Sequence, residues 1–205
     1  MLLFILIPLL ILSSEYPHFT TDEFMLIEKE SGRIAKNRSI DYQQKVSQLK
    51  TYNQTKQLNM VNLYLNQLLP QYDDVIQKKE DYWATPKEFL ITGYGDCEDY
   101  VIIKYFTLIK LGFDENKLFI TTVNEKYQGG YHMVLSYFKE KNKAPLILDN
   151  LSFKVLDLTT RTDIQADFFI NSNGVFKIDE NYKLKKIAHH SKEYDLLLEK
   201  IKKEY

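Results

Sequence analysis

Cys97, the single cysteine of the chain, is flanked by the acidic residues Asp96, Glu98 and Asp99 in the stretch GDCEDY. Negative charge beside a thiol disfavours the thiolate, whereas the dipole and free amide groups at a helix start favour it. Such a cysteine becomes a nucleophile when an imidazole takes its proton, and a third group usually orients that imidazole. The residues that could complete a triad therefore decide what Cys97 does.

His132 is the histidine of the four that lies in a predicted strand, YHMVLSYF at 131–138. A polar turn, KEKNK, separates it from a second predicted strand, APLILDNL at 144–151. If the turn is centred between residues 140 and 141, His132 lies directly opposite Asp149, with Cβ atoms roughly 5 Å apart on one face. This register predicts that Asp149 orients His132, and a one-residue slip would separate the two side chains.

Each candidate residue also has a purely structural interpretation. A lone cysteine in an apolar helix is often buried and inert, His132 can be a hydrogen-bonded strand residue, and Asp149 can begin a turn. The acids are good helix starters, because Asp96 suits the N-cap and carboxylates in the first turn favour the dipole. A divalent cation bound by the three carboxylates would instead neutralise their field and fix the loop. Spacing alone leaves both interpretations open.

The flanking segments predict the elements that must position these residues. Polar-faced helices are expected from residue 15 to about 80, ending at Pro70 in the last of them, and Thr85-Pro86 with Glu88 predict the start of a short helix. Asp96 is then placed to cap a buried helix that carries Cys97 in its first turn and stops at Gly112. Strands follow at 117–124, 131–138 and 144–151, then a hairpin turning at Asn173-Gly174 and an amphipathic C-terminal helix over 191–205. The fold class is therefore α+β, with a helical N-terminal part and an antiparallel sheet packed on the central helix that bears the cysteine.

Length and composition limit the remaining possibilities. The 205 residues suit one domain, and 27 basic against 28 acidic residues, without a dense basic block, argue against a nucleic-acid partner. An uncharged run of twelve residues at the N-terminus is shorter than a spanning helix needs, so residues 1–14 are predicted to be a signal peptide, or alternatively an uncleaved anchor. Residues 15–205 are predicted to form the single domain, without an intrachain disulfide.

The order GDCEDY, a long apolar helix, YHMVL and LILDNL resembles the bacterial transglutaminase-like cysteine peptidases, the LapG type of periplasmic protease. The resemblance runs from about Trp83 to Leu151. It implies a papain-like or transglutaminase-like fold with Cys97 as nucleophile, His132 as general base and acid, and Asp149 as orienting carboxylate. It also implies dependence on Ca²⁺ held by Asp96, Glu98 and Asp99.

The same resemblance implies a substrate, a regulator and a location. The family cuts the N-terminal region of a large, repeat-rich surface adhesin in the periplasm, which releases the adhesin and disperses a biofilm. An inner-membrane receptor for cyclic di-GMP sequesters the protease. Two alternatives use the same residues: a transglutaminase-like acyltransferase, and a non-catalytic calcium-binding or docking module. Trp83 either walls the cleft or belongs to the core.

Overall fold

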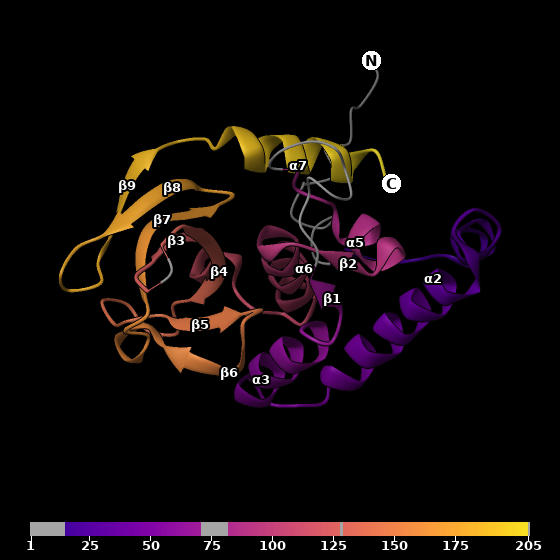
Figure 1. The fold of residues 1–205 in the computed structure, drawn as a ribbon, viewed down its shortest axis with the longest axis horizontal. Coiled ribbons are helices and arrows are strands. Elements are labelled where there is room, and N and C mark those ends of the chain that lie inside the picture. Colours follow the sequence, from indigo (N-terminus) through magenta and orange to yellow (C-terminus); the bar gives the residue numbers. More distant parts are fainter. Residues whose placement is uncertain (1–14, 71–81, 128, 205) are drawn as a thin grey trace, which may run out of the picture.

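The computed structural model describes residues 15–70, 82–127 and 129–204. Strands β3 to β9 gather on one side of helix α6, helices α2, α3 and α5 lie on the other, and α7 runs across the top (Figure 1). This arrangement confirms the predicted α+β fold. The helices are α2 (Thr21–Leu49), α3 (Gln54–Leu65), α5 (Pro86–Thr92), α6 (Cys97–Lys110) and α7 (Lys192–Lys202), with 3-10 turns η1 (Glu115–Lys117) and η2 (Leu158–Thr160). The strands are β1 (Leu69–Pro70), β2 (Tyr94–Gly95), β3 (Leu118–Glu125), β4 (Tyr131–Tyr137), β5 (Leu146–Asp149), β6 (Ser152–Asp157), β7 (Ile164–Asn171), β8 (Gly174–Ile178) and β9 (Leu184–Ala188).

The N-terminal helices confirm the helical prediction for the described part of residues 15–80. Helix α2 starts with a capping box between Thr20 and Glu23 and is kinked at Gly32, where φ is 87°. Helix α3 ends at Leu65, earlier than the predicted stop at Pro70, which lies instead in a short parallel bridge to Gly95. Residues 71–81 lie outside the described part of the chain.

Helix α5 begins and ends as its sequence predicts. The Thr85 hydroxyl accepts from the Glu88 backbone N–H at 3.1 Å, and the Glu88 carboxylate accepts from the Thr85 N–H at 2.7 Å. The helix stops at Gly93, whose φ of 82° favours glycine. Arg38 of α2 donates to two carbonyl oxygens of the last turn, at 3.0 Å each, and a Cβ at Gly93 would overlap its guanidinium. Helix α2 thereby fixes the chain directly before the cysteine loop.

Helix α6 is the centre of the core. Its residues 98–109 are all buried, and they pack with Leu118, Ile120, Leu135 and Leu148 of the sheet. Burying each such aliphatic side chain contributes about 1.5–3 kcal/mol. The helix ends before Gly112, where φ is 90°, as predicted. The N-terminus of α6, and with it Cys97, is held by the largest apolar cluster of the described residues.

The main sheet is antiparallel throughout, in the order β6-β5-β4-β3-β7-β8-β9. The two edge strands, β6 and β9, were not predicted from the sequence. Both carry mostly polar or half-exposed residues (SFKVLD and LKKIA), and edge strands typically carry charge that prevents further pairing. Their sequences therefore lack the apolar alternation that indicates an inner strand.

The predicted register of the hairpin between β4 and β5 is wrong. The strands span Tyr131–Tyr137 and Leu146–Asp149, and Leu135 pairs with Leu148, so the same register continued places His132 opposite Leu151 rather than Asp149. The physical reason is a longer connection, which includes Phe138 and Pro145 in addition to KEKNK. Since the shift is by an even number of residues, His132 and Asp149 still point to one face.

The predicted turn of the next hairpin is also displaced. Asn171 pairs with Gly174, so Ser172 and Asn173 form the loop instead of Asn173 and Gly174. Gly174 begins β8 with φ of 125°, and a Cβ there would overlap the carbonyl oxygen of Ala188. Glycine at this position therefore permits the close approach of β9.

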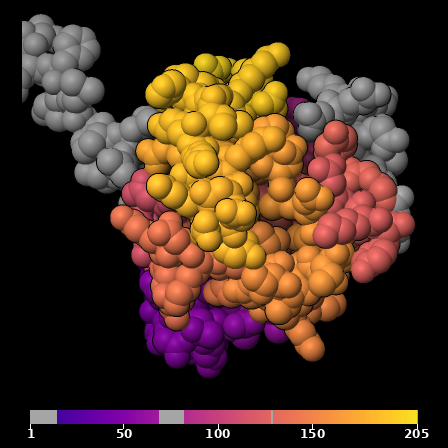
Figure 2. Space-filling view, turned by 90° about the vertical axis from the view of Figure 1, so that its left-hand side faces the viewer, coloured from indigo at the N-terminus to yellow at the C-terminus, as the bar shows by residue number. Residues whose placement is uncertain are grey.

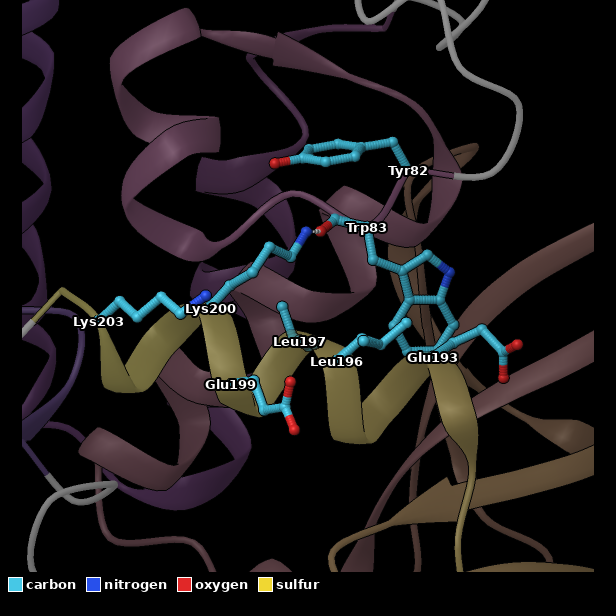
Figure 3. A pocket seen from close by; sticks show the side chains of 8 residues that line it. All are labelled: Tyr82, Trp83, Glu193, Leu196, Leu197, Glu199, Lys200 and Lys203. Carbon is cyan, nitrogen blue, oxygen red and sulfur yellow. Dashed lines mark hydrogen bonds between the residues drawn. The ribbon is translucent and has the colours of Figure 1, made fainter.

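Helix α7 confirms the predicted amphipathic C-terminal helix. Leu197 is fully buried, whereas its neighbour Leu196 is 49% exposed. Lys200 reaches across to the carbonyl oxygen of Trp83, and its ammonium lies 3.8 Å from the ring centre of Tyr82 (Figure 3). Trp83 is 5% exposed and belongs to the main core, which confirms the core interpretation.

One face of the molecule is formed by the sheet, the C-terminal segment and part of the helical N-terminal region. Figure 2 shows this face, with the C-terminal residues above the strands and the helical N-terminal part below. None of the helices among residues 15–70, 82–127 and 129–204 is long and apolar enough to span a membrane. The predicted signal peptide, residues 1–14, lies outside the described residues, so the division of the chain stays a prediction.

Candidate active site

Cys97 is the first residue of α6, as predicted. Asp96 occupies the N-cap position, but its side chain makes no capping hydrogen bond, so the expectation of an Asp96 cap is wrong. The carboxyl groups of Asp96 and Glu98 hydrogen-bond each other instead. The Asp96 side chain therefore leaves the first backbone N–H groups of α6 uncapped, and the start of a helix favours negative charge.

The thiol of Cys97 lies in a buried, acidic environment. Burial raises its pKa well above the usual range, and the charge of Glu98 raises it further. The Cys97 Sγ–H donates to a Glu98 carboxylate oxygen at 3.2 Å. The backbone N–H of Met133 hydrogen-bonds the Cys97 sulfur and lowers the pKa of the thiol. The sulfur therefore lies beside Met133, the strand residue that follows His132. With Glu98 in this position the thiol is protonated. Ionisation of the thiol requires that the negative charge of Glu98 be neutralised.

His132 and Asp149 are brought together as the triad hypothesis requires. His132 Nε2 lies 2.9 Å from Asp149 Oδ1, and the two residues are 9% and 0% exposed. An ionised carboxylate only accepts hydrogen bonds, so Nε2 carries the proton and Nδ1 is the nitrogen left to accept one. The contact joins residues that are diagonal, rather than directly opposite, in the sheet.

Asp149 is held as a carboxylate by three donors. Besides His132, the backbone N–H of Leu151 donates to Oδ1 at 2.9 Å and Arg161 Nη2 donates to Oδ2 at 2.8 Å. Burial would raise the pKa of Asp149, but these hydrogen bonds, led by that of His132, lower it to about 2. The carboxylate is therefore charged at any physiological pH.

Two functional side chains were missed by the sequence analysis. Arg161 lies in the connection between β6 and β7, and Asn66, just beyond α3, donates to the Asp149 carbonyl oxygen at 2.7 Å. Neither belongs to a recognisable motif. The available signal was RTD at 161–163, a charged pair that resembles many surface ion pairs.

Lys104 is a further buried charge near the site. It is fully buried on α6, two turns beyond Cys97, and its Nζ has no hydrogen-bond acceptor among the residues that the structure describes. Burial lowers the pKa of Lys104 to about 7, while the negative charge of Asp149 opposes that shift. Asp149 thus lies in the field of two cationic side chains, those of Lys104 and Arg161.

The three acids around the cysteine carry carboxylate oxygens, which are suitable ligands for a cation, but only two of them, Asp96 and Glu98, lie together. Asp96 and Glu98 share a hydrogen bond, and burial raises the pKa of Glu98, so a cation could take the place of the shared proton. Asp99 accepts instead from the backbone N–H of Ala84, at 2.8 Å. Within the described residues, no three His, Cys, Asp or Glu side chains converge as a metal site. Calcium binding here would need backbone or water oxygens as well.

A cavity of about 270 Å³ lies away from the residues just described. Its walls are Tyr82, Trp83 and one side of α7, and Figure 3 shows the lysine and glutamate side chains along that helix. Neither Cys97, His132 nor Asp149 lines it.

Comparison with known proteins identifies the family of this chain. A family model for bacterial transglutaminase-like cysteine proteinases (BTLCP) matches residues 32–166. Legionella pneumophila LapG in a calcium-bound structure is 31% identical with a TM-score of 0.71, covering 87% of this chain and 98% of its own. An EGTA-treated structure of the same protein is 30% identical with a TM-score of 0.74, covering 87% of this chain and 97% of its own. A third structure of it is 29% identical with a TM-score of 0.75, covering 90% of this chain and 97% of its own. Curated proteins give no match. The chain therefore belongs to the bacterial transglutaminase-like cysteine proteinases.

Proposed function

We propose that this cysteine peptidase is an endopeptidase that works through Cys97, His132 and Asp149. The observation that carries the proposal is the 2.9 Å contact between His132 Nε2 and the fully buried Asp149 carboxylate, next to the strand residue whose N–H faces Cys97. This arrangement leaves His132 Nδ1 to take the thiol proton. Asp149 fixes the ring and stabilises the imidazolium that forms.

The reaction proceeds through a thioester. Cys97 transfers its proton to His132 and its sulfur adds to the scissile carbonyl, and His132 then protonates the departing amine as the C–N bond breaks. In the second half, His132 takes a proton from water, whose oxygen adds to the thioester carbonyl, and the thiol is regenerated with release of the acid. The Cys97 backbone N–H at the helix start is a natural donor to the oxyanion.

Asp96, Glu98 and Asp99 are the residues that would hold calcium. Bound calcium supplies positive charge that offsets the carboxylates beside Cys97. The relatives described as calcium-bound and EGTA-treated support a role for this ion. As a ligand of the ion, Glu98 would oppose ionisation of the Cys97 thiol less than it does through its 3.2 Å contact with Sγ.

The biological substrate we propose is the N-terminal region of a large surface adhesin, cut in the periplasm to disperse a biofilm. An inner-membrane cyclic di-GMP receptor would control access to the protease. Family membership and the similarity to LapG support this proposal. A transglutaminase-like acyl transfer to an amine would use the same three residues, and the products distinguish the two reactions.

The first test is cleavage by Cys97→Ser and Cys97→Ala variants. Wild-type protein is expected to convert the adhesin N-terminal region into fragments with new amino termini, seen by mass spectrometry, and both variants should lose at least about 10³-fold in rate. Ammonia release or crosslinking without new termini would favour the acyltransferase. Cleavage that survives in Cys97→Ala would overturn the proposal.

The second test is removal of calcium. Excess EGTA should abolish cleavage and added calcium should restore it, while Glu98→Gln should weaken calcium binding about 10- to 100-fold, measured by calorimetry. Glu180→Gln, at an exposed position, is the matched control and should bind calcium as wild type does. Full activity of wild-type protein in excess EGTA would contradict the calcium requirement.

A further inference from the structure

Arg161 forms a fork between two carboxylates. Its Nη2 donates to Asp149 Oδ2 at 2.8 Å and to Asp163 Oδ2 at 2.7 Å, and its Nε donates to both oxygens of Asp163 at 2.9 and 3.1 Å. A planar guanidinium held at two edges has little rotational freedom. Asp163 therefore fixes the direction in which Arg161 faces Asp149.

Burial along this chain of charges increases toward the site. The side chains of Asp163, Arg161 and Asp149 are 37%, 9% and 0% exposed. An exposed ion pair contributes little, but a buried carboxylate that loses its cation is strongly disfavoured. The contact between Arg161 and Asp149 lies at the buried end, where it constrains the carboxylate most.

The two oxygens of Asp149 have separate partners. Oδ1 accepts hydrogen bonds from His132 and from the Leu151 N–H, and Oδ2 accepts one from Arg161. Rotation of the carboxylate would break the contact with His132 and the contact with Arg161 at the same time. The bond from Arg161 therefore keeps Oδ1 directed at the imidazole.

The fold explains how a residue from a distant segment arrives here. Side chains alternate between the two faces of the sheet along each strand. On β4, His132 therefore shares a face with Val134, and on β5, Asp149 shares that same face with Ile147. Met133 and Leu148 lie on the opposite face, which packs on the main core. Leu158, at the start of the connection from β6 to β7, packs on that second cluster of Val134 and Ile147. The connection thereby crosses the face on which Asp149 lies, and it delivers Arg161.

We propose that Arg161, held by Asp163, is a positioning residue that fixes the Asp149 carboxylate for His132. The inference rests on the proposed function, in which Asp149 orients His132. Arg161 does not touch the reacting atoms and acts through Asp149. An arginine that served only stability would leave the imidazole hydrogen bond unchanged.

The direct test follows the His132 Nε2 proton by ¹H–¹⁵N NMR, assigned through its loss in Asp149→Asn. Arg161→Met is expected to speed its exchange with solvent by at least about tenfold, and Asp163→Asn by a smaller factor. Lys177→Met removes a half-exposed ion pair with Asp167 in the same sheet and should change nothing. Unchanged exchange of the His132 Nε2 proton in Arg161→Met would overturn the inference. If Arg161→Met does not fold, unchanged exchange in Asp163→Asn would overturn it instead.

A double-mutant cycle supplies the kinetic readout, with p-nitrophenyl acetate as a small acyl donor that needs no peptide recognition. Arg161→Met should lower Cys97-dependent turnover about tenfold in the wild-type background and less than about twofold in Asp149→Asn. Equal losses in both backgrounds would show that Arg161 does not act through Asp149. Ester turnover with an intact cycle, but without cleavage of any polypeptide, would overturn the endopeptidase proposal and leave the role of Arg161 standing.

Discussion

Charged side chains, most of them buried, determine the chemistry around Cys97. Glu98 keeps the thiol protonated, whereas Arg161 and Lys104 surround Asp149 with positive charge. The sequence identified Cys97, His132 and Asp149 as candidates from their order and their elements. Arg161 and Lys104 could not be identified in this way, because burial gives these charges their effect and their neighbours in sequence do not reveal it.

Lys104→Met is expected to stabilise the protein most at and below about pH 7. The pKa of Lys104 is about 7 in the folded state against 10.5 for a free lysine, so between these values the unfolded chain binds the extra proton. Wild-type stability therefore gains from Lys104 as pH rises through this window, by about 1.4 kcal/mol per unit. The advantage of Lys104→Met, measured by urea unfolding, should be largest and constant below about pH 7, fall as pH rises from 7, and be small above pH 10.

The exposed Lys141→Met is the control for that series, and its difference from wild type should stay near zero at every pH. Titration of Cys97 and the tyrosines is common to both proteins and cancels in the comparison. An advantage of Lys104→Met that is independent of pH would contradict the lowered pKa.

Inner strands and several helix ends were predicted correctly because their signals are local, whereas the predicted stop at Pro70 and the Asp96 cap were wrong. The capping box of α5, the stop of α6 at Gly112 and the amphipathic α7 all follow from residues within a few positions of one another. The edge strands β6 and β9 and the length of the β4–β5 connection were not predicted. Pairing with a distant strand determines these features, and a polar edge strand carries little pattern of its own.

Helix α7 offers a matched pair of neighbours for testing how it is anchored. Leu197→Ala removes a fully buried side chain and should lower the free energy of unfolding by about 2–5 kcal/mol, measured by urea denaturation. Leu196→Ala, at a position 49% exposed, should change it by less than about 0.5 kcal/mol. Equal effects of the two substitutions would contradict the packing of α7 on the core.

The complete fold joins segments that are far apart in sequence. Tyr16, near the N-terminal end of the described chain, donates to Glu204 at 2.5 Å, and Thr85 at the start of α5 donates to the other oxygen of Glu204 at 2.5 Å. The same kind of long-range contact brings Asn66 and Arg161 to Asp149. The site is thus supported by the helical part, the sheet and a connection between strands.

The order of cysteine, histidine and aspartate, the helix that carries the thiol and the strands that carry the other two were readable from local patterns. Their shared face was also predicted, but only because the true register differs from the predicted one by two residues, since a one-residue difference would have sent the side chains to opposite faces. The diagonal pairing of His132 with Asp149, the Glu98 bond to the thiol and the charges of Arg161 and Lys104 required the folded chain. These features depend on distance and burial between segments, and neither quantity is encoded in the spacing of residues along the sequence.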